Sequence, residues 1–192
     1  MSDYFTMLVD PHVPLLAADA SLRELANALQ NRGIIGHDCS EDCVLSGTGY
    51  RPGSAIIDYY TPGPNEFPFW QLKTCGVELL AKRGFNHSAI GPSFNGMTCP
   101  KCGRTYSDLP DDFIDAVEQW INQAERCTVR CGGCNTEISV DHWDAKNPFG
   151  FGNLSITFWN WPPFDRPGWV IDIPDFVKTV MGNAIISTFG NV

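Results

Sequence analysis

The sequence predicts an α+β protein with a small mixed or antiparallel sheet, packed helices, and an inserted unit that carries four cysteines. Three observations support this fold class. Residues 154–159 alternate between apolar and polar side chains, which is typical of a strand. Apolar residues recur at helical spacing between 109 and 124. Two Cys-x-x-Cys pairs, at 99–102 and 131–134, flank that helix, so a separate small unit interrupts the α+β part.

The composition is that of a globular protein. The chain has 192 residues, of which 43% are hydrophobic and 18% charged, and a chain of this size buries roughly 70% of its unfolded surface. We expect an N-terminal α+β part at 1–95, the inserted unit at 96–142, and a C-terminal part at 143–192 that completes the core.

The N-terminal part predicts a strand, a helix and a second strand. The first strand, Tyr4 to Val9, ends at Asp10-Pro11, and the helix that follows has a capping box of Ser21 and Glu24. Gly33 can end this helix. Residues 55–60 predict a strand. Residues 67–84 fit strands better than a helix, although so short an apolar run does not decide between them.

The clearest helix runs from about Leu109 to Ala124. Asp108 can cap it, Pro110 suits its first turn, and its apolar residues form one stripe. Residues 137–142 then predict a strand.

The C-terminal part repeats the order strand, helix, strand. In the strand at 154–159, Leu154, Ile156 and Phe158 face one way. A short strand at 169–173, a helix from Pro174 to Gly182 and a last strand at 184–189 follow. Strand–helix–strand at both ends would suit a four-stranded sandwich of the ferredoxin-like type with the cysteine unit in its middle.

The two cysteine pairs predict a structural metal site with ligands Cys99, Cys102, Cys131 and Cys134. Four thiolates surround Zn²⁺ tetrahedrally at about 2.3 Å, and a two-residue gap lets one tight turn aim two sulfurs at one ion. We expect one Zn²⁺ per chain. Because all four positions are filled by protein, no coordination position stays open for a substrate.

These pairs resemble the knuckles of zinc-ribbon and rubredoxin-like proteins, and Cys99-Pro100-Lys101-Cys102-Gly103 has their common Cys-Pro-x-Cys-Gly form. The resemblance covers residues 97–140 and implies the four cysteine ligands. The chain departs from a plain ribbon in the 28 residues between the pairs, which predict a helix instead of a hairpin. Rubredoxin-like sites hold iron, so an iron-binding electron carrier is an alternative.

Charge disfavours nucleic acid as a partner. The formal net charge is −9, and residues 98–142 contain four basic and eight acidic residues, with no basic stripe. No run approaches the roughly 20 apolar residues that span a bilayer, and the N-terminus lacks the pattern of a secretory signal. We expect a cytoplasmic protein without membrane contact; the sequence does not predict its oligomeric state.

Other candidate sites have weaker patterns. His37, Cys39, Cys43 and Cys75 could form a second metal site, or the cysteines could be free thiols or a chance pair in a surface loop. Cys127 suits a small apolar role. An acid–base pair of His142 and Asp144, or a base and nucleophile at His87-Ser88, would define a hydrolase, but neither lies in a known catalytic motif.

Trp159 and Trp161 complete the candidates. They alternate onto the face opposite Phe158, where they would form an exposed partner-binding patch or be buried by a second layer. Taken together, the sequence predicts a zinc-containing, non-enzymatic binding or scaffold protein that engages another protein, with a hydrolase and an iron electron carrier as alternatives.

Overall fold

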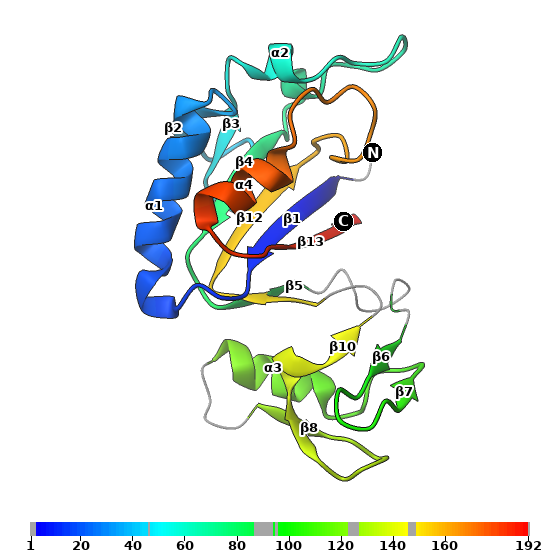
Figure 1. The fold of residues 1–192 in the computed structure, drawn as a ribbon. Coiled ribbons are helices and arrows are strands. Elements are labelled where there is room, and N and C mark those ends of the chain that lie inside the picture. The colour runs from blue at the N-terminus through cyan, green and yellow to red at the C-terminus, as the bar shows by residue number, and fades with distance from the viewer. Residues whose placement is uncertain are drawn as a thin grey trace.

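The largest feature of the protein is a six-stranded antiparallel sheet (Figure 1). The computed structural model describes residues 3–45, 47–86, 94, 96–122, 127–145 and 149–191. The strand order in the sheet is β13-β1-β12-β4-β3-β2. These strands are β1 (Tyr4–Asp10), β2 (Ile35–Ser40), β3 (Gly49–Pro52), β4 (Gly76–Leu80), β12 (Leu154–Trp159) and β13 (Ile186–Asn191).

Strand β12 lies inside the sheet and was predicted with its observed bounds. It pairs with β1, where Leu8 lies opposite Ile156, and with β4, where Val77 lies opposite Phe158. The residues predicted for the core face, Leu154, Ile156 and Phe158, are buried. Alternation identified this strand because one of its faces packs on helices, which requires apolar side chains at every second position.

Two helices, α1 (Leu15–Asn31) and α4 (Ile173–Met181), cover one face of the sheet (Figure 1). Helix α4 follows the sequence closely: Asp172 caps it by accepting a hydrogen bond from the Asp175 N–H, and Gly182 ends it at φ +71°. Helix α1 begins earlier than the capping box predicted. Ser21 lies inside it, because residues 15–20 are Leu and Ala apart from Asp19, which favours helix, and Ala18 is buried against the core.

The strands predicted at 55–60 and 169–173 are absent from the described structure, and of the strands predicted over 67–84, β4 forms but its N-terminal part does not. Residues 56–59 form the helical turn α2 (Ile56–Tyr59), and Phe69–Gln71 form a 3-10 turn. Residues 169–173 make only a single bridge, from Trp169 to Tyr60. The aromatic rings of these segments pack on one another; for example, the ring centroids of Tyr60 and Phe69 are 5.6 Å apart. Their apolar side chains therefore take part in ring packing and not in strand pairing.

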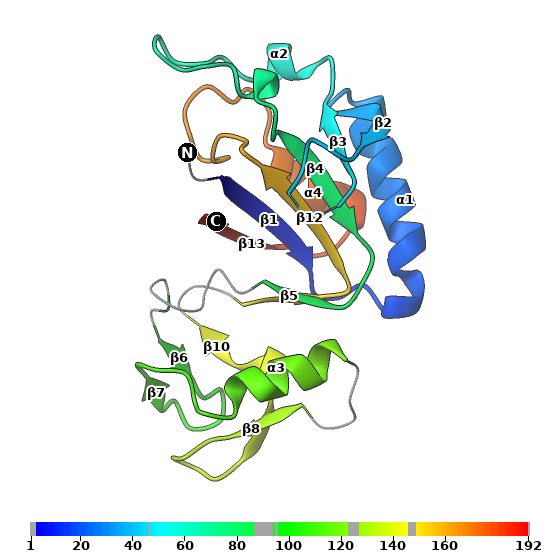
Figure 2. The same cartoon turned by 180° about the vertical axis from the view of Figure 1, so that it is seen from behind.

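The cysteine unit forms a second body with its own core (Figure 2). Its helix α3 (Phe113–Ile121) is shorter than predicted and begins after Asp112 rather than Asp108. The strands are β6 (Met97–Thr98), β7 (Thr105–Tyr106), β8 (Thr128–Arg130), β9 (Glu137–Ser139) and β10 (Asp144–Ala145). The strand predicted at 137–142 ends at Ser139, and the 3-10 turn Val140–His142 follows.

A two-stranded ribbon lies between the sheet and the cysteine unit. It pairs β5 (Gly84–Asn86) with β11 (Gly150–Gly152). Phe149 and Phe151 belong to the core of the cysteine unit, and Phe85 packs on Phe151 at 4.5 Å. The core of the unit therefore extends past the boundary expected at residue 142.

Candidate metal centre

The two cysteine pairs converge at one end of the unit. The sulfur atoms of Cys99, Cys102, Cys131 and Cys134 all lie within 4.8 Å of one another. This is the one group of three or more metal-ligating side chains that the described part of the chain brings together. The fold thus brings together Cys102 and Cys131, which are 29 positions apart in the sequence, and Cys99 and Cys134, which are 35 positions apart.

The sulfur spacing suits one tetrahedral ion. The Sγ atoms of Cys99 and Cys134 are 3.9 Å apart, and those of Cys102 and Cys131 are 3.7 Å apart. Four sulfurs at about 2.3 Å from a shared ion would be separated by about 3.8 Å. The arrangement could therefore hold a metal ion without moving the backbone.

Both knuckles have the same backbone construction. Gly103 N–H donates to Cys99 O at 3.0 Å, and Asn135 N–H donates to Cys131 O at 2.8 Å. Gly103 (φ +74°) and Asn135 (φ +57°) both follow the second cysteine of their pair in left-handed conformation. Glycine and asparagine are the residues that adopt this region at least cost, so the sequence favours the turn at both places.

Backbone amides also point at the sulfurs. Lys101 N–H lies 3.4 Å from Cys99 Sγ, and Gly133 N–H lies 3.3 Å from Cys131 Sγ. Such hydrogen bonds stabilise negative charge on a thiolate, which is the form that binds a metal.

A tyrosine that the sequence analysis did not single out contacts the second knuckle. Tyr106 Oη lies 3.2 Å from Cys131 Sγ and accepts a hydrogen bond from the Gly132 N–H at 2.9 Å. The hydrogen bond from Tyr106 is the main reason why the pKa of Cys131 falls to about 6. Tyr106 lies on β7, the strand that leaves the first knuckle, and β7 pairs with β6, the strand that enters the knuckle. The position of Tyr106 shortly after the first Cys-x-x-Cys pair was the sequence signal that could have identified it.

Arg104 joins the two knuckles. Its Nη1 donates to Gly132 O at 2.8 Å, and its guanidinium lies 5.3 Å from the centre of the Tyr106 ring. The first knuckle thereby fixes the backbone of the second from outside the sulfur cluster.

One side of the centre is buried. Cys99 and Cys131 belong to the core of the unit, whereas Cys102 is exposed. A metal there would join the hydrophobic core to two surface turns. Sulfur ligands of this number and spacing suit zinc and iron alike, so the geometry shows a candidate metal site and leaves the element open.

The second metal site that the sequence allowed is not assembled. Cys75 and Cys43 are buried, in two different apolar clusters, while His37 and Cys39 are exposed. Burial is the main cause that raises the pKa of Cys75 to about 12, which keeps this thiol protonated. Free thiols explain these residues, and Cys127 is partly buried beside the core of the cysteine unit.

The catalytic candidates do not share a deep pocket. His142 is exposed and lines a hollow of about 290 Å³, and Asp144, also exposed, is not among its lining residues. His87 and Ser88 lie outside the described residues.

Of the two alternatives for Trp159 and Trp161, the structure shows burial and not an exposed partner-binding patch. Trp159 is 7% exposed and Trp161 is fully buried, so neither offers a surface to a partner. Trp159 packs on Phe5 on one face of the sheet, with the ring centroids 5.2 Å apart. Trp161 packs on Phe158 within the main core, with the ring centroids 5.1 Å apart. Both faces of β12 are covered, so its alternation did not mark an exposed face.

Fold and site together define an α+β protein with a module in which four cysteines lie close enough to bind a metal ion. Comparisons with models of known protein families, with curated protein sequences and with solved structures find no match. Among the described residues, no helix is both long and apolar enough to cross a membrane.

Proposed function

We propose that the protein is a non-enzymatic binding protein in which one structural Zn²⁺ holds the cysteine module together and the acidic surface engages another protein. The observation that carries the zinc assignment is the convergence of four cysteine sulfurs within 4.8 Å, with every tetrahedral position supplied by the chain. A site closed in this way stabilises a fold and offers no vacant position for chemistry.

Energetics support a structural role. Binding of Zn²⁺ by small four-ligand sites is worth about 10–16 kcal/mol, which is comparable to the whole stability of a domain. The module has a small core and strands of two or three residues, so the ion would supply a large part of its stability.

Charge supports a protein partner with a basic surface. The net charge of −9 attracts such a partner over a Debye length of about 8 Å at physiological salt and repels nucleic acid. An iron-binding electron carrier uses the same four sulfurs, and the test below separates the two.

We also propose that β1, α1, β4, β12, α4 and β13 form a ferredoxin-like core. Two features support it: strand–helix–strand order occurs at both ends of the chain, and the sheet contains the order β13-β1-β12-β4. Strands β2 and β3 would then be an extension of that sheet beyond β4.

The zinc assignment is tested by elemental analysis and a visible spectrum of the purified protein. We expect about one zinc per chain and no absorption band in the visible range; a red protein containing iron would favour the electron carrier. Cys102→Ser and Cys131→Ser should abolish stoichiometric zinc and make the module protease-sensitive. Cys127→Ser is the matched control, because this cysteine lies in the same module but outside the sulfur cluster. Unchanged behaviour of both ligand variants would refute a structural metal.

A further inference from the structure

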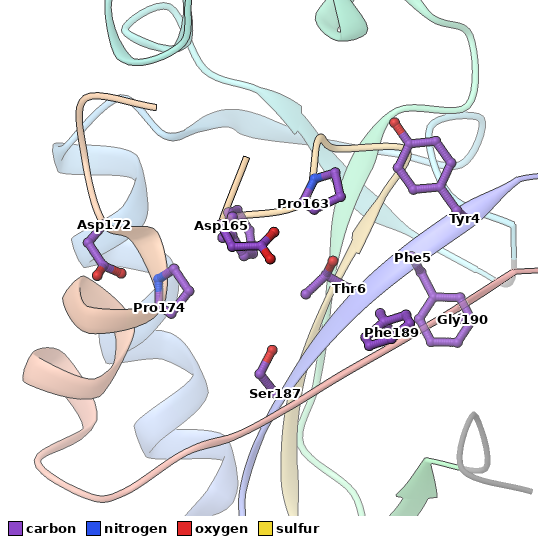
Figure 3. Close-up of a pocket in the computed structure, with 11 residues that line it drawn as sticks. Tyr4, Phe5, Thr6, Pro163, Asp165, Asp172, Pro174, Ser187, Phe189 and Gly190 are labelled. Carbon is purple, nitrogen blue, oxygen red and sulfur yellow. The ribbon is translucent and has the colours of Figure 1, made fainter. Parts of the chain in front are cut away.

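A groove lies on the helix-covered face of the sheet, toward the β13 edge. Its volume is about 900 Å³. Figure 3 shows strands β1 and β13 on one side of the space, with the start of α4 and the loop before it on the other. The lining residues are Tyr4, Phe5, Thr6, Pro163, Phe164, Asp165, Asp172, Pro174, Ser187, Phe189 and Gly190. We call this space the β1–β13 groove.

The floor of the groove follows the paired strands β1 and β13. Thr6 pairs with Phe189 across the two strands, and Ser187 lies opposite Leu8, so Tyr4 and Ser187 are about four residues apart along the sheet. At about 3.4 Å per residue, the floor is about 14 Å long. That length suits an extended peptide of about four residues better than a compact small molecule.

The lining combines apolar rings with negative charge. Phe189 is 80% exposed and lines the groove, so its ring can contact an apolar side chain of a partner. Asp165 and Asp172 supply two carboxylates, and no Lys, Arg or His is among the described lining residues. In Figure 3 the Asp165 side chain lies between Asp172 and Thr6. An occupant that brings positive charge next to an apolar side chain complements this surface.

The wall that carries Asp165 is fixed by its surroundings. Phe164 packs on Phe158 at 4.9 Å, and Trp169 Nε1 donates to Pro163 O at 3.1 Å. Arg166, the nearest cation in the sequence, is held by Glu66 at 3.1 Å. The charge of Asp165 is therefore not neutralised by its neighbour, and the loop needs little ordering when a partner binds.

The wall that carries Asp172 is equally fixed. One oxygen of this carboxylate caps α4 through the Asp175 N–H at 2.9 Å. Ile173 and Val177 are buried and anchor the same helix to the core.

From this complementarity we propose that the β1–β13 groove docks an extended basic segment of a partner protein, with arginine or lysine side chains at Asp165 and Asp172 and an apolar side chain on Phe189. The proposal deepens the proposed function, because it gives the acidic binding protein a defined contact surface. None of the described residues that line the groove belongs to the cysteine module.

The test uses the full-length protein and a labelled pentapeptide, Gly-Arg-Leu-Arg-Gly, followed by fluorescence anisotropy. A neutral peptide, Gly-Gln-Leu-Gln-Gly, and free argininamide as a competitor complete the set. We expect saturable binding of the arginine peptide that weakens with added salt, no saturable binding of the glutamine peptide, and poor competition by argininamide.

Variants locate the binding. Asp165→Asn and Asp172→Asn should each weaken binding by about 2- to 5-fold, since one partly exposed ion pair contributes up to about 1 kcal/mol. Asn retains the cap at position 172, so α4 is preserved. Phe189→Ser should weaken binding by at least about 5-fold. Asp175→Asn is the matched control, because it removes the same charge from the same helix but does not line the groove.

Three results would overturn the proposal: equal binding of the arginine and glutamine peptides, an equal loss with Asp175→Asn, or full competition by argininamide, which would indicate a small-amine site. Zinc content measured on the same samples keeps the two proposals separate. If the protein contains one zinc per chain but does not bind the arginine peptide, the groove proposal is refuted and the metal assignment is unaffected.

Discussion

The hydroxyl of Tyr106 contacts both a cysteine and the backbone of the second knuckle. It sits 3.2 Å from Cys131 Sγ and accepts the Gly132 N–H. Groups in this position orient metal ligands, and their removal typically costs about 10- to 100-fold in metal affinity.

Tyr106→Phe should therefore still bind zinc, but about 10- to 100-fold more weakly, because the ring remains while both hydrogen bonds are lost. Competition with a chromogenic chelator measures the change. Tyr59→Phe is the control, since its hydroxyl donates to Arg32 O in the main sheet domain. Equal affinities for the two variants would contradict a supporting role for Tyr106.

At the scale of elements, helix α4 is defined by its two ends. Asp172 supplies the N-cap and Gly182 the left-handed residue after the last turn. A side chain built at Gly182 would meet no atom within 4 Å, so a substitution there tests the backbone conformation alone.

We expect Gly182→Ala to lower the free energy of unfolding by about 1–2 kcal/mol, because alanine is strained at φ +71°. Gly182→Asn should lose less, since asparagine tolerates this conformation better. Chemical denaturation of both variants measures the difference. A neutral alanine variant would show that α4 does not end as described.

The aromatic ribbon is the other informative element. Phe85, Phe149 and Phe151 come from β5 and the β11 region, and they complete the core of the cysteine module. The Arg83 guanidinium lies 4.1 Å from the centre of the Trp120 ring, which adds a contact between the ribbon region and α3. The module is therefore attached by packing as well as by two passages of the chain.

At the scale of the whole molecule, two cores are separate. The main core lies between the sheet and helices α1 and α4, and the second surrounds α3 and the knuckles. Metal binding should therefore stabilise the second core much more than the first.

Removal of the metal by a chelator should increase hydrogen exchange in residues 97–122 and 127–145 and leave β1, β12 and α1 protected. The reason is that the four cysteines belong to the module alone. Hydrogen exchange with mass spectrometry, before and after zinc is restored, measures this. Loss of protection throughout the sheet would mean that the two cores unfold as one unit.

The sequence determined the parts whose signals are local. The metal-ligand candidates follow from two short spacings, β12 from alternation, and α4 from Pro174 and Gly182. Each of these depends on residues a few positions apart, where backbone preferences act directly.

Only the tertiary structure decided the rest. Residues 55–60 and 67–72 look like strands by composition, yet their rings are used in a shared aromatic cluster, and Trp159 and Trp161 are buried by distant segments. The β1–β13 groove joins residues from both ends of the chain. Burial and long-range contacts depend on which segments pack against one another in the folded protein. Local sequence patterns, such as alternation or helical spacing, do not identify those partners.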